Sequence, residues 1–501
     1  MELSELDKFK EGNRLEAKLA QGGLPGSVWE TVSAFANTSG GRIVLGVKES
    51  HDGSFELVGL KDARKMLDDF WNAALSKDKL SARFLGDEDA RVETVDGKDV
   101  IVIDVPRVSR LMRPVFLKKD ILGETWRRTH TGDHRCTREE VQSMLRDAEA
   151  ESADSHLAGQ AKMADLCSET IERYRRRFAL MNEGHIWNNE GDEDFLKFIG
   201  AADEDAEGVL RPTLAGLLMF GRDDRITRVL PNYFLDYRQE AGADERWEDR
   251  FVSFSGDWSG NVYDFYFKVY NRLKAPLKVP FRMEGIDRVD DTPAHQALRE
   301  AIVNCVTNAN YHERRGIVCV WRDDALVIEN PGDFRIPVEE AMKPGKSDPR
   351  NATMLKMFAM VDAGERAGSG ISKILHGWRE AGYAEPSYSE EYGPDRTVLV
   401  LPLSERVRPE GEATQTFREG GVSALLAEFA RLDDKEKAAL SIAFERGQVT
   451  TSSLANELGS SKKTASRTLK SLEGRGLLVW RGSGVHDPLQ CYEIPQGSSE
   501  G

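Results

Sequence analysis

The chain has 501 residues, which is enough for about three or four domains of ordinary size. Its 69 Lys and Arg against 85 Asp and Glu give a formal net charge of −16, which excludes a histone-like polycation and restricts any nucleic-acid surface to a local basic patch. Hydrophobic residues make up 40% and charged residues 31%, as in a soluble globular protein rather than a disordered or fibrous one.

The sequence also lacks the patterns of membrane-spanning, secreted and disulfide-rich proteins. The longest apolar stretch, near 214–220, is far shorter than the roughly 18 residues that span a bilayer. The first residues, MELSELDKFKEGN, are polar and lack the apolar core of a secretion signal. The five cysteines are scattered and form no CxxC pair, so neither a zinc knuckle nor a disulfide framework is indicated. We therefore expect a cytoplasmic protein that does not engage a membrane.

Residues 1–150 mix helical and strand patterns. Ser27 and Thr137 stand where N-caps begin helices, and Thr137 opens a T-x-x-E capping box with Glu140. Glycines bound the apolar runs that predict buried strands. The expected elements are a helix over 29–36, strands over 42–47 and 99–105, and a charged helix over 137–148.

Three carboxylates in this segment are candidates for a metal site. Glu11 and Glu16 lie five residues apart, Lys18 follows two residues later, and Glu49 comes after the first predicted strand. Carboxylates that meet from a helix and a strand end can hold Mg²⁺ or Mn²⁺, which activates water for phosphodiester cleavage while a lysine neutralises the phosphate. The alternative is that they are solvated surface charges.

Short motifs around these carboxylates carry a family resemblance. They are AFANTSGG at 34–41, GVKE at 46–49, VG at 58–59, RPV at 113–115 and WRRTHTGD at 126–133. Together they resemble the Schlafen-type AlbA domain over most of residues 5–147. The resemblance implies a nuclease that cuts tRNA and related nucleic acids through three metal-binding acidic residues. Glu11 and Glu16 match the first two, and Glu49 is the candidate third, because Lys48 stands where the family often has Asp.

A basic stretch overlaps the end of this segment. Between Arg107 and Arg138 nine basic residues stand against three acidic ones, with Trp126 available for stacking. The alternative is a surface neutralised by acids elsewhere in the fold. The candidates for nucleic-acid contact are Arg113, Lys118, Lys119, Arg127 and Arg128.

Residues 149–160 have the composition of a connector, 161–290 predict an α/β connecting region, and 291–403 predict a further α/β domain. Glu300 and Asn304 lie at i and i+4 on one helix face, with Asn308 one turn further. GERAGSGI at 364–371 is a glycine turn that opens a helix and presents N–H groups to phosphate. PGKS at 344–347 is no P-loop, because position 340 is Glu.

The ordered motifs ALREAIVN at 297–304, VIENPG at 327–332, RN at 350–351 and GSGI at 368–371 resemble the GHKL-type ATPase domain. The resemblance implies ATP binding, with Glu300 as general base, Asn304 on Mg²⁺, and Asn330 where the superfamily has an adenine-binding Asp. The alternative is a helix with a surface Glu followed by a glycine turn. The implied cofactor-binding residues are Glu300, Asn304, Asn308, Asn330, Gly332, Gly368 and Gly370.

Residues 404–420 have linker composition, and 421–496 predict a small terminal domain. Helices over 435–446, 451–459 and 462–473, followed by a strand pattern over 474–482, resemble a winged helix-turn-helix. The resemblance implies DNA contact, with dimerisation or docking as the alternative. The implied contacts are Lys462, Lys463, Arg467 and Lys470 on the recognition helix and Arg481 on the wing.

We therefore expect a multidomain α+β and α/β protein with an AlbA-like domain, a GHKL-like α/β sandwich and a winged helix. The first functional hypothesis is a metal-dependent endoribonuclease for tRNA-like RNA in phage defence or stress, with Mg²⁺ or Mn²⁺ as cofactor and ATP sensing. The alternative is a DNA-binding transcriptional regulator with a non-catalytic AlbA domain and a ligand- or ATP-sensing GHKL-like domain. RNA or duplex DNA is the expected partner, and a homodimer is expected by analogy.

Overall fold

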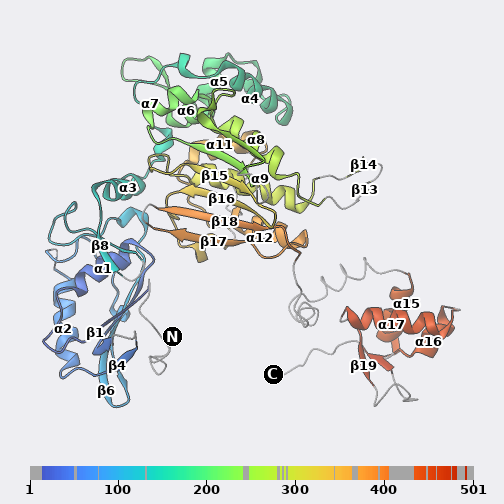
Figure 1. Cartoon of the computed structure of the whole chain (residues 1–501), viewed down its shortest axis with the longest axis horizontal. Coiled ribbons are helices and arrows are strands. Elements are labelled where there is room, and N and C mark those ends of the chain that lie inside the picture. The colour runs from blue at the N-terminus through green and yellow to red at the C-terminus, as the bar shows by residue number, and fades with distance from the viewer. Residues whose placement is uncertain are drawn as a thin grey trace. The chain divides into compact units, whose positions relative to one another are not determined.

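The computed structural model falls into two compact units, residues 1–406 and 407–501, which are described separately (Figure 1). The described residues are 14–49, 54–76, 78–129, 132–240, 247–278, 283–284, 287–288, 291–343, 345–363, 370–392, 395–405, 434–446, 449–458, 460–475, 477–481 and 491–493. Glu11, Gly368 and most of the expected linker lie outside them. No helix of these residues is long and apolar enough to cross a membrane.

The first 150 residues build a four-stranded sheet in the order β1-β2-β6-β5. β1 runs parallel to β2, and β2, β6 and β5 pair antiparallel. Helices α1 and α2 pack on one face, where Trp29 and Phe70 stack at 5.1 Å. The elements are β1 (Leu15–Lys18), α1 (Val28–Asn37), β2 (Gly41–Leu45), β3 (Val47–Glu49), β4 (Phe55–Leu57), α2 (Ala63–Ala74), β5 (Ala90–Val95), β6 (Lys98–Val105), the 3₁₀ turn η3 (Arg110–Met112), β7 (Trp126–Thr129), β8 (Gly132–Arg135) and α3 (Arg138–Ala148).

Local sequence signals account for most of these boundaries. The predicted capping box is confirmed, since the Thr137 hydroxyl accepts a hydrogen bond from the Glu140 N–H at 3.2 Å and the Glu140 carboxylate accepts one from the Thr137 N–H at 2.7 Å. Ser27 holds the N-cap position of α1, but its side chain makes no capping bond. The strand predicted over 42–47 ends at Leu45, because Gly46 turns the chain with a φ of +97°.

The rest of the first unit is built on a six-stranded sheet in the order β12-β11-β15-β16-β18-β17. β11 runs parallel to β15, and the other neighbours are antiparallel. The strands are β9 (Ala202–Glu204) and β10 (Leu210–Pro212), which pair separately, then β11 (Leu235–Gln239), β12 (Asp249–Val252), β13 (Met283–Glu284), β14 (Asp287–Arg288), β15 (Ile317–Trp321), β16 (Ala325–Pro331), β17 (Ser387–Glu391) and β18 (Arg396–Pro402). The helices are α4 (Ser168–Met181), α5 (Asp192–Ile199), α6 (Leu214–Phe220), α7 (Asp223–Val229), α8 (Val262–Leu273), α9 (Pro293–Asn308), α10 (Val338–Ala341), α11 (Ala352–Met360) and α12 (Gly370–Glu380).

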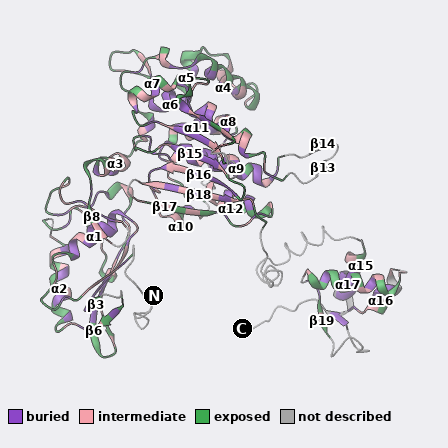
Figure 2. Cartoon of the chain, in the orientation of Figure 1, coloured by how far each residue is buried: buried purple, intermediate pink, exposed green. Residues whose placement is uncertain are grey.

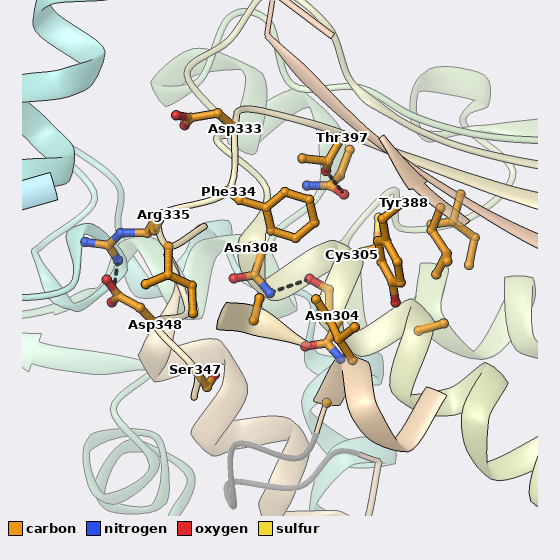
Figure 3. A pocket seen from close by; sticks show the side chains of 18 of the residues that line it. Asn304, Cys305, Asn308, Asp333, Phe334, Arg335, Ser347, Asp348, Tyr388 and Thr397 are labelled. Atoms are coloured by element: carbon orange, nitrogen blue, oxygen red, sulfur yellow. Dashed lines mark hydrogen bonds and ion pairs between the residues drawn. The ribbon is translucent and has the colours of Figure 1, made fainter. Parts of the chain in front are cut away.

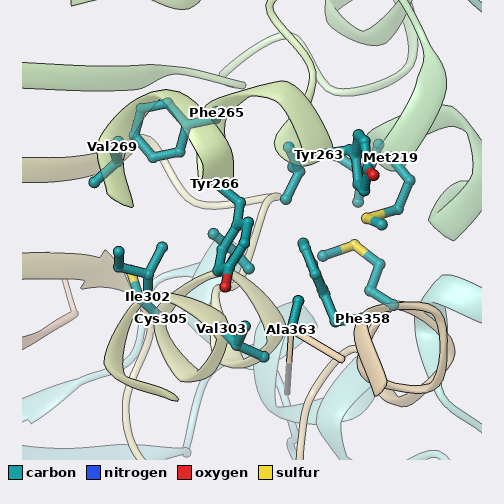
Figure 4. Packing of buried hydrophobic residues seen from close by; sticks show 14 of the residues in the cluster. Met219, Tyr263, Phe265, Tyr266, Val269, Ile302, Val303, Cys305, Phe358 and Ala363 are labelled. Atoms are coloured by element: carbon teal, nitrogen blue, oxygen red, sulfur yellow. The ribbon is translucent and has the colours of Figure 1, made fainter. Parts of the chain in front are cut away.

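One face of this sheet carries the main hydrophobic core (Figure 2). α9 packs on β16 and also contacts α8, α11 and α12. At its centre, Tyr266 of α8 meets Phe358 of α11 with ring centroids 5.3 Å apart, beside Val303 of α9 (Figure 4). The core runs continuously from Ala158 to Leu401. The predicted connecting region 161–290 therefore shares its core and its sheet with residues 291–403.

The second unit has its own small core, around Ala443, Leu469 and Leu472. Its described residues form three helices followed by an antiparallel strand pair, close to the predicted helix boundaries. These elements are α15 (Asp434–Arg446), α16 (Thr451–Glu457), α17 (Lys462–Gly474), β19 (Val479–Arg481) and β20 (Cys491–Glu493). The Ser461 hydroxyl accepts a hydrogen bond from the Thr464 N–H at 3.2 Å, which caps α17 at its predicted start.

Candidate functional site

A pocket opens between α9 and the core face of the six-stranded sheet. Strand register places two cross-strand rows on this face, because every second residue of a strand points the same way. Ile328, Leu399 and Tyr388 form one row, and Asn330 pairs with Thr397 in the next. The pocket holds about 770 Å³ of empty space, part of it open to solvent.

The α9 side of the pocket carries the predicted polar face (Figure 3). Asn304 and Asn308 both line the cavity. The Asn304 amide donates to Glu300 Oε1 at 3.1 Å, and the Asn308 amide donates to the Asn304 carbonyl at 2.9 Å. Glu300 is only 4% exposed and lies beneath Asn304 rather than on the surface. The helical spacing therefore predicted this group of residues correctly.

The glycines of the predicted set have different surroundings. A Cβ at Gly370, the first residue of α12, would lie 2.6 Å from Asn304 Nδ2 and 3.1 Å from Glu300 Oε1, so a larger residue there would displace the Asn304 amide. A Cβ at Gly332 would lie 2.9 Å from Arg350 Nη1, and the φ of Gly332 is +97°. Gly370 thus lines the pocket, whereas Gly332 packs against a guanidinium behind it.

The sheet side supplies residues that the sequence did not single out. Thr397 donates to Asn330 Oδ1 at 2.7 Å, and the Phe334 ring meets the Tyr388 ring edge-on at 6.1 Å. The Tyr388 hydroxyl is buried and has no hydrogen-bond partner in the structure as described. Burial, and then the charge of Glu300, raise the pKa of Tyr388, so the phenol stays a neutral donor. The alternation of residues along β18 predicts that Thr397 and Leu399 point to the same face of the sheet. No local sequence pattern predicts that Thr397 pairs with Asn330 on the neighbouring strand.

These residues could hold a nucleotide. The flat Ile328, Leu399 and Tyr388 row offers an apolar surface for a ring, and Asn330 offers amide hydrogen bonding at its edge. Lys346 lies at the pocket with the cationic group expected near phosphate. The Asn304 side-chain oxygen suits Mg²⁺, which usually takes one or two protein ligands together with phosphates. A bound Mg²⁺ would neutralise phosphate charge there.

Two of the carboxylates predicted to bind a metal, Glu16 and Glu49, lie in the first domain, away from this pocket. Glu16 lies on strand β1, where Oε1 accepts from Lys18 Nζ at 2.7 Å and Oε2 accepts from Arg128 Nη1 at 2.7 Å. Glu49 is exposed at the end of β3. Within the described ranges, no three His, Cys, Asp or Glu side chains are grouped to hold a metal ion. Glu11 lies outside the described residues, so the predicted group of three carboxylates stays a prediction.

The basic stretch is split between the interior and the surface. The side chains of Arg113, Arg127 and Arg128 are only 5%, 4% and 1% exposed and form ion pairs, for example Arg127 Nη1 with Asp395 Oδ2 at 2.6 Å. This corrects the expectation that they form an open surface. Lys118 and Lys119 remain 62% and 71% exposed, although each contacts one carboxylate.

Helix α17 separates its apolar and basic residues. Ala465, Leu469 and Leu472 point into the small core. Arg481 on β19 is also exposed. The exposed basic residues of α17 are Lys462, Lys463, Arg467 and Lys470.

Comparison with known families matches three segments of the chain. Residues 7–137 match the family described as "Schlafen, AlbA_2". Residues 318–400 match "Putative ATP-dependent DNA helicase recG C-terminal". Residues 142–236 match a domain of unknown function. No curated protein matches the chain.

Two solved structures are similar to parts or all of the chain. The N-terminal domain of a "Putative ATP-dependent DNA Helicase RecG-related Protein" from Nitrosomonas europaea is 33% identical, with 27% of this chain and 90% of that chain covered and a TM-score of 0.22. The DIP2311 protein from Corynebacterium diphtheriae is 17% identical, with 96% and 92% covered and a TM-score of 0.41.

Proposed function

We propose that the protein is a nucleotide-responsive DNA-binding regulator, because residues 7–137 match the Schlafen AlbA_2 model and residues 318–400 match the RecG C-terminal model. A purine nucleotide binds in the pocket between α9 and the sheet, and duplex DNA binds the basic face of α17. In this proposal the second unit is a winged helix and the AlbA_2 domain contacts nucleic acid without cutting it.

The observation that carries the proposal is the pocket itself. It brings together Asn304 and Asn308 of α9, Asn330 of β16 and Gly370 of α12. Asn304 and Asn330 are 26 positions apart in the sequence. An enclosed surface with a few converging polar groups is the usual form of a small-molecule site. By contrast, Glu16 is neutralised by Lys18 and Arg128, which favours a non-catalytic first domain.

Nucleotide binding is tested by titration calorimetry of the full chain with ATP, GTP and Mg²⁺. Asn330→Ala removes the amide at the edge of the apolar row and should weaken binding about 5- to 10-fold, the equivalent of one hydrogen bond. Asn232→Ala, on the exposed surface, is the matched control. Absence of binding by the unaltered protein at millimolar nucleotide would reject this part of the proposal.

DNA binding is tested by the salt dependence of duplex affinity. The double change Lys463→Ala and Arg467→Ala should lower affinity and reduce the slope of log affinity against log salt by about 1.8, if each residue neutralises one phosphate. The control pair Arg64→Ala and Lys65→Ala removes two exposed charges from α2. Equal slopes for the two double variants would exclude α17 as the DNA-binding surface.

A second candidate is a metal-dependent endoribonuclease for tRNA-like RNA, which the Schlafen match favours. The full chain and Glu16→Gln are incubated with tRNA, single-stranded DNA and duplex DNA, each with Mn²⁺ or with EDTA. Cutting that needs Mn²⁺ and is lost in Glu16→Gln would establish this candidate and displace the regulator. Intact RNA, together with retained duplex binding, would support the regulator.

The expected homodimer is tested by light scattering, which measures the molar mass of the full chain with and without DNA.

A further inference from the structure

Part of the pocket wall is held from behind by the first domain. The wall consists of residues 333–336 and 346–348, which line the cavity. Three arginines that follow strand β6 contact this wall: Arg107, Arg110 and Arg113. None of the three lines the cavity, so each reaches the pocket only through a wall residue.

The contacts are direct and closely spaced. Arg107 Nη2 donates to Asp333 Oδ2 at 3.2 Å and also to the Phe334 carbonyl. Arg113 Nη1 donates to the same Asp333 oxygen at 3.1 Å. Arg110 Nε donates to Asp348 Oδ2 at 2.6 Å. Both ends of the wall are thus fixed by guanidinium groups of the other domain.

Burial makes the Asp333 pairs strong constraints. The side chains of Arg107 and Arg113 are 6% and 5% exposed, and that of Asp333 is 13% exposed. Burial alone would raise the pKa of Asp333, but Arg113 and Arg107 hold it well below its usual value. A buried carboxylate that loses its partner leaves an uncompensated charge, so Asp333 cannot leave the arginines at low cost.

Helix α3 fixes the same wall from a second direction. Arg350 Nη2 donates to Asp147 Oδ2 at 2.8 Å and to the Asp333 carbonyl at 3.2 Å. Arg335 Nη2 donates to the Asp147 carbonyl at 3.1 Å. The position of residues 333–335 is therefore set by groups between Arg107 and Asp147, not by the sheet alone.

We propose that Arg107 and Arg110 are positioning residues of the nucleotide pocket, supplied by the AlbA_2 domain. This inference rests on the proposed nucleotide binding and adds that the site is complete only while the two domains are docked. Nucleotide binding and docking are then linked by one coupling free energy, so each strengthens the other by the same factor. A nucleotide in the pocket consequently strengthens the docking of the first domain, whose residues 7–137 match the AlbA_2 model.

The test uses Arg110, whose side chain and that of Asp348 are 16% and 27% exposed, more than those of the Asp333 pairs. Arg110 Nη1 also donates to the Asp147 and Glu149 carbonyls, both at 2.7 Å, so its removal loosens the end of α3 as well as the wall. Arg110→Ala in the full chain should weaken ATP binding about 5-fold or more, and Arg110→Lys, which keeps the charge, should restore part of it. The control Arg91→Ala breaks ion pairs with Glu93 and Asp104 inside the first domain and should leave ATP affinity unchanged.

Hydrogen exchange supplies a readout that a merely structural role would not move. The amides of Met112 and Arg113 are bonded within η3, to the carbonyls of Ser109 and Arg110, and lie outside the cavity. Saturating ATP should slow their exchange in the unaltered chain but not in Arg110→Ala. Exchange at these amides measures how firmly the first domain is docked, whereas calorimetry measures the affinity of the pocket for ATP.

The outcomes separate the inference from the function on which it rests. If the unaltered chain binds ATP, while Arg110→Ala binds equally well and exchange at η3 does not respond, the positioning role is refuted and nucleotide binding stands. A lower melting temperature for Arg110→Ala with unchanged ATP affinity also refutes it. If the unaltered chain does not bind ATP, the proposed nucleotide function fails, and this inference fails with it.

Discussion

Replacing Tyr388 by Phe removes a single oxygen from the pocket and leaves the ring in place. The ring keeps its edge contact with Phe334 at 6.1 Å. The lost hydroxyl is buried without a partner in the described structure, and such a group costs about 1–3 kcal/mol. We therefore expect Tyr388→Phe to stabilise the protein without nucleotide by up to that amount. At about 2–4 °C per kcal/mol for a domain of this size, the melting temperature should rise by several degrees.

The same change should act in the opposite direction on binding. If the hydroxyl finds an acceptor on the bound nucleotide, its removal forfeits about 0.5–1.5 kcal/mol, or roughly 2- to 10-fold in affinity. The assays are thermal unfolding by calorimetry without ligand and titration with ATP. Tyr174→Phe is the matched control, because the Tyr174 hydroxyl is buried and donates to the Met357 carbonyl at 2.9 Å, so its loss should destabilise.

One result would refute this reasoning about Tyr388. If Tyr388→Phe lowers the melting temperature as Tyr174→Phe does, and ATP affinity is unchanged, then the hydroxyl is satisfied in the folded protein without ligand. An ordered water between Tyr388 and Glu300 would produce that result, and the hydroxyl would then have no part in recognition.

Three further predictions follow from the geometry. Gly370→Ala places a Cβ 2.6 Å from Asn304 Nδ2, an overpacking that typically costs about 1–3 kcal/mol. Because it displaces the Asn304 amide at the pocket, nucleotide affinity measured by calorimetry should fall, and equal affinity would contradict this. The arginines hold the pKa of Asp333 low despite burial, so the stability that its carboxylate contributes is complete above the unfolded pKa of about 3.9 and is lost as pH falls below it. The difference in unfolding stability between the unaltered chain and Asp333→Asn, followed by circular dichroism, should therefore shrink only in acid, and a difference that shrinks near pH 6 would argue otherwise. Burial, opposed by Arg127, raises the pKa of Cys136 to about 12, so iodoacetamide at pH 8 should label it far more slowly than the unfolded chain, as measured by mass spectrometry; equal rates would disprove its burial.

The parts of the fold that depend on neighbouring residues could be predicted from the sequence. The capping box at Thr137 needs only residues three apart, and the strand over 98–105 follows from its apolar run. The common helix face of Glu300, Asn304 and Asn308 follows from helical periodicity. These features are local, so no knowledge of the rest of the chain was needed.

The features that were missed depend on contacts between distant residues. Arg127 appeared as a surface charge because its partner, Asp395, lies 268 residues away in the chain. Thr397 could be placed beside Asn330 only through the register of two strands, which local patterns do not specify. The hydrogen bond from Arg128 to Glu16 joins residues 112 positions apart, so local patterns could not predict it either.

The continuous core from Ala158 to Leu401 determines where the chain can be divided by evolution or by design. A cut at the expected boundary near 290 would expose both halves of one apolar interior, and β11 would lose its pairing with β15. The second unit buries its own side chains, so it can be exchanged as a module together with helix α17. Recombination between residues 406 and 434 would therefore replace the basic face of α17, to which we assign DNA binding, while the pocket and its supporting arginines are inherited together.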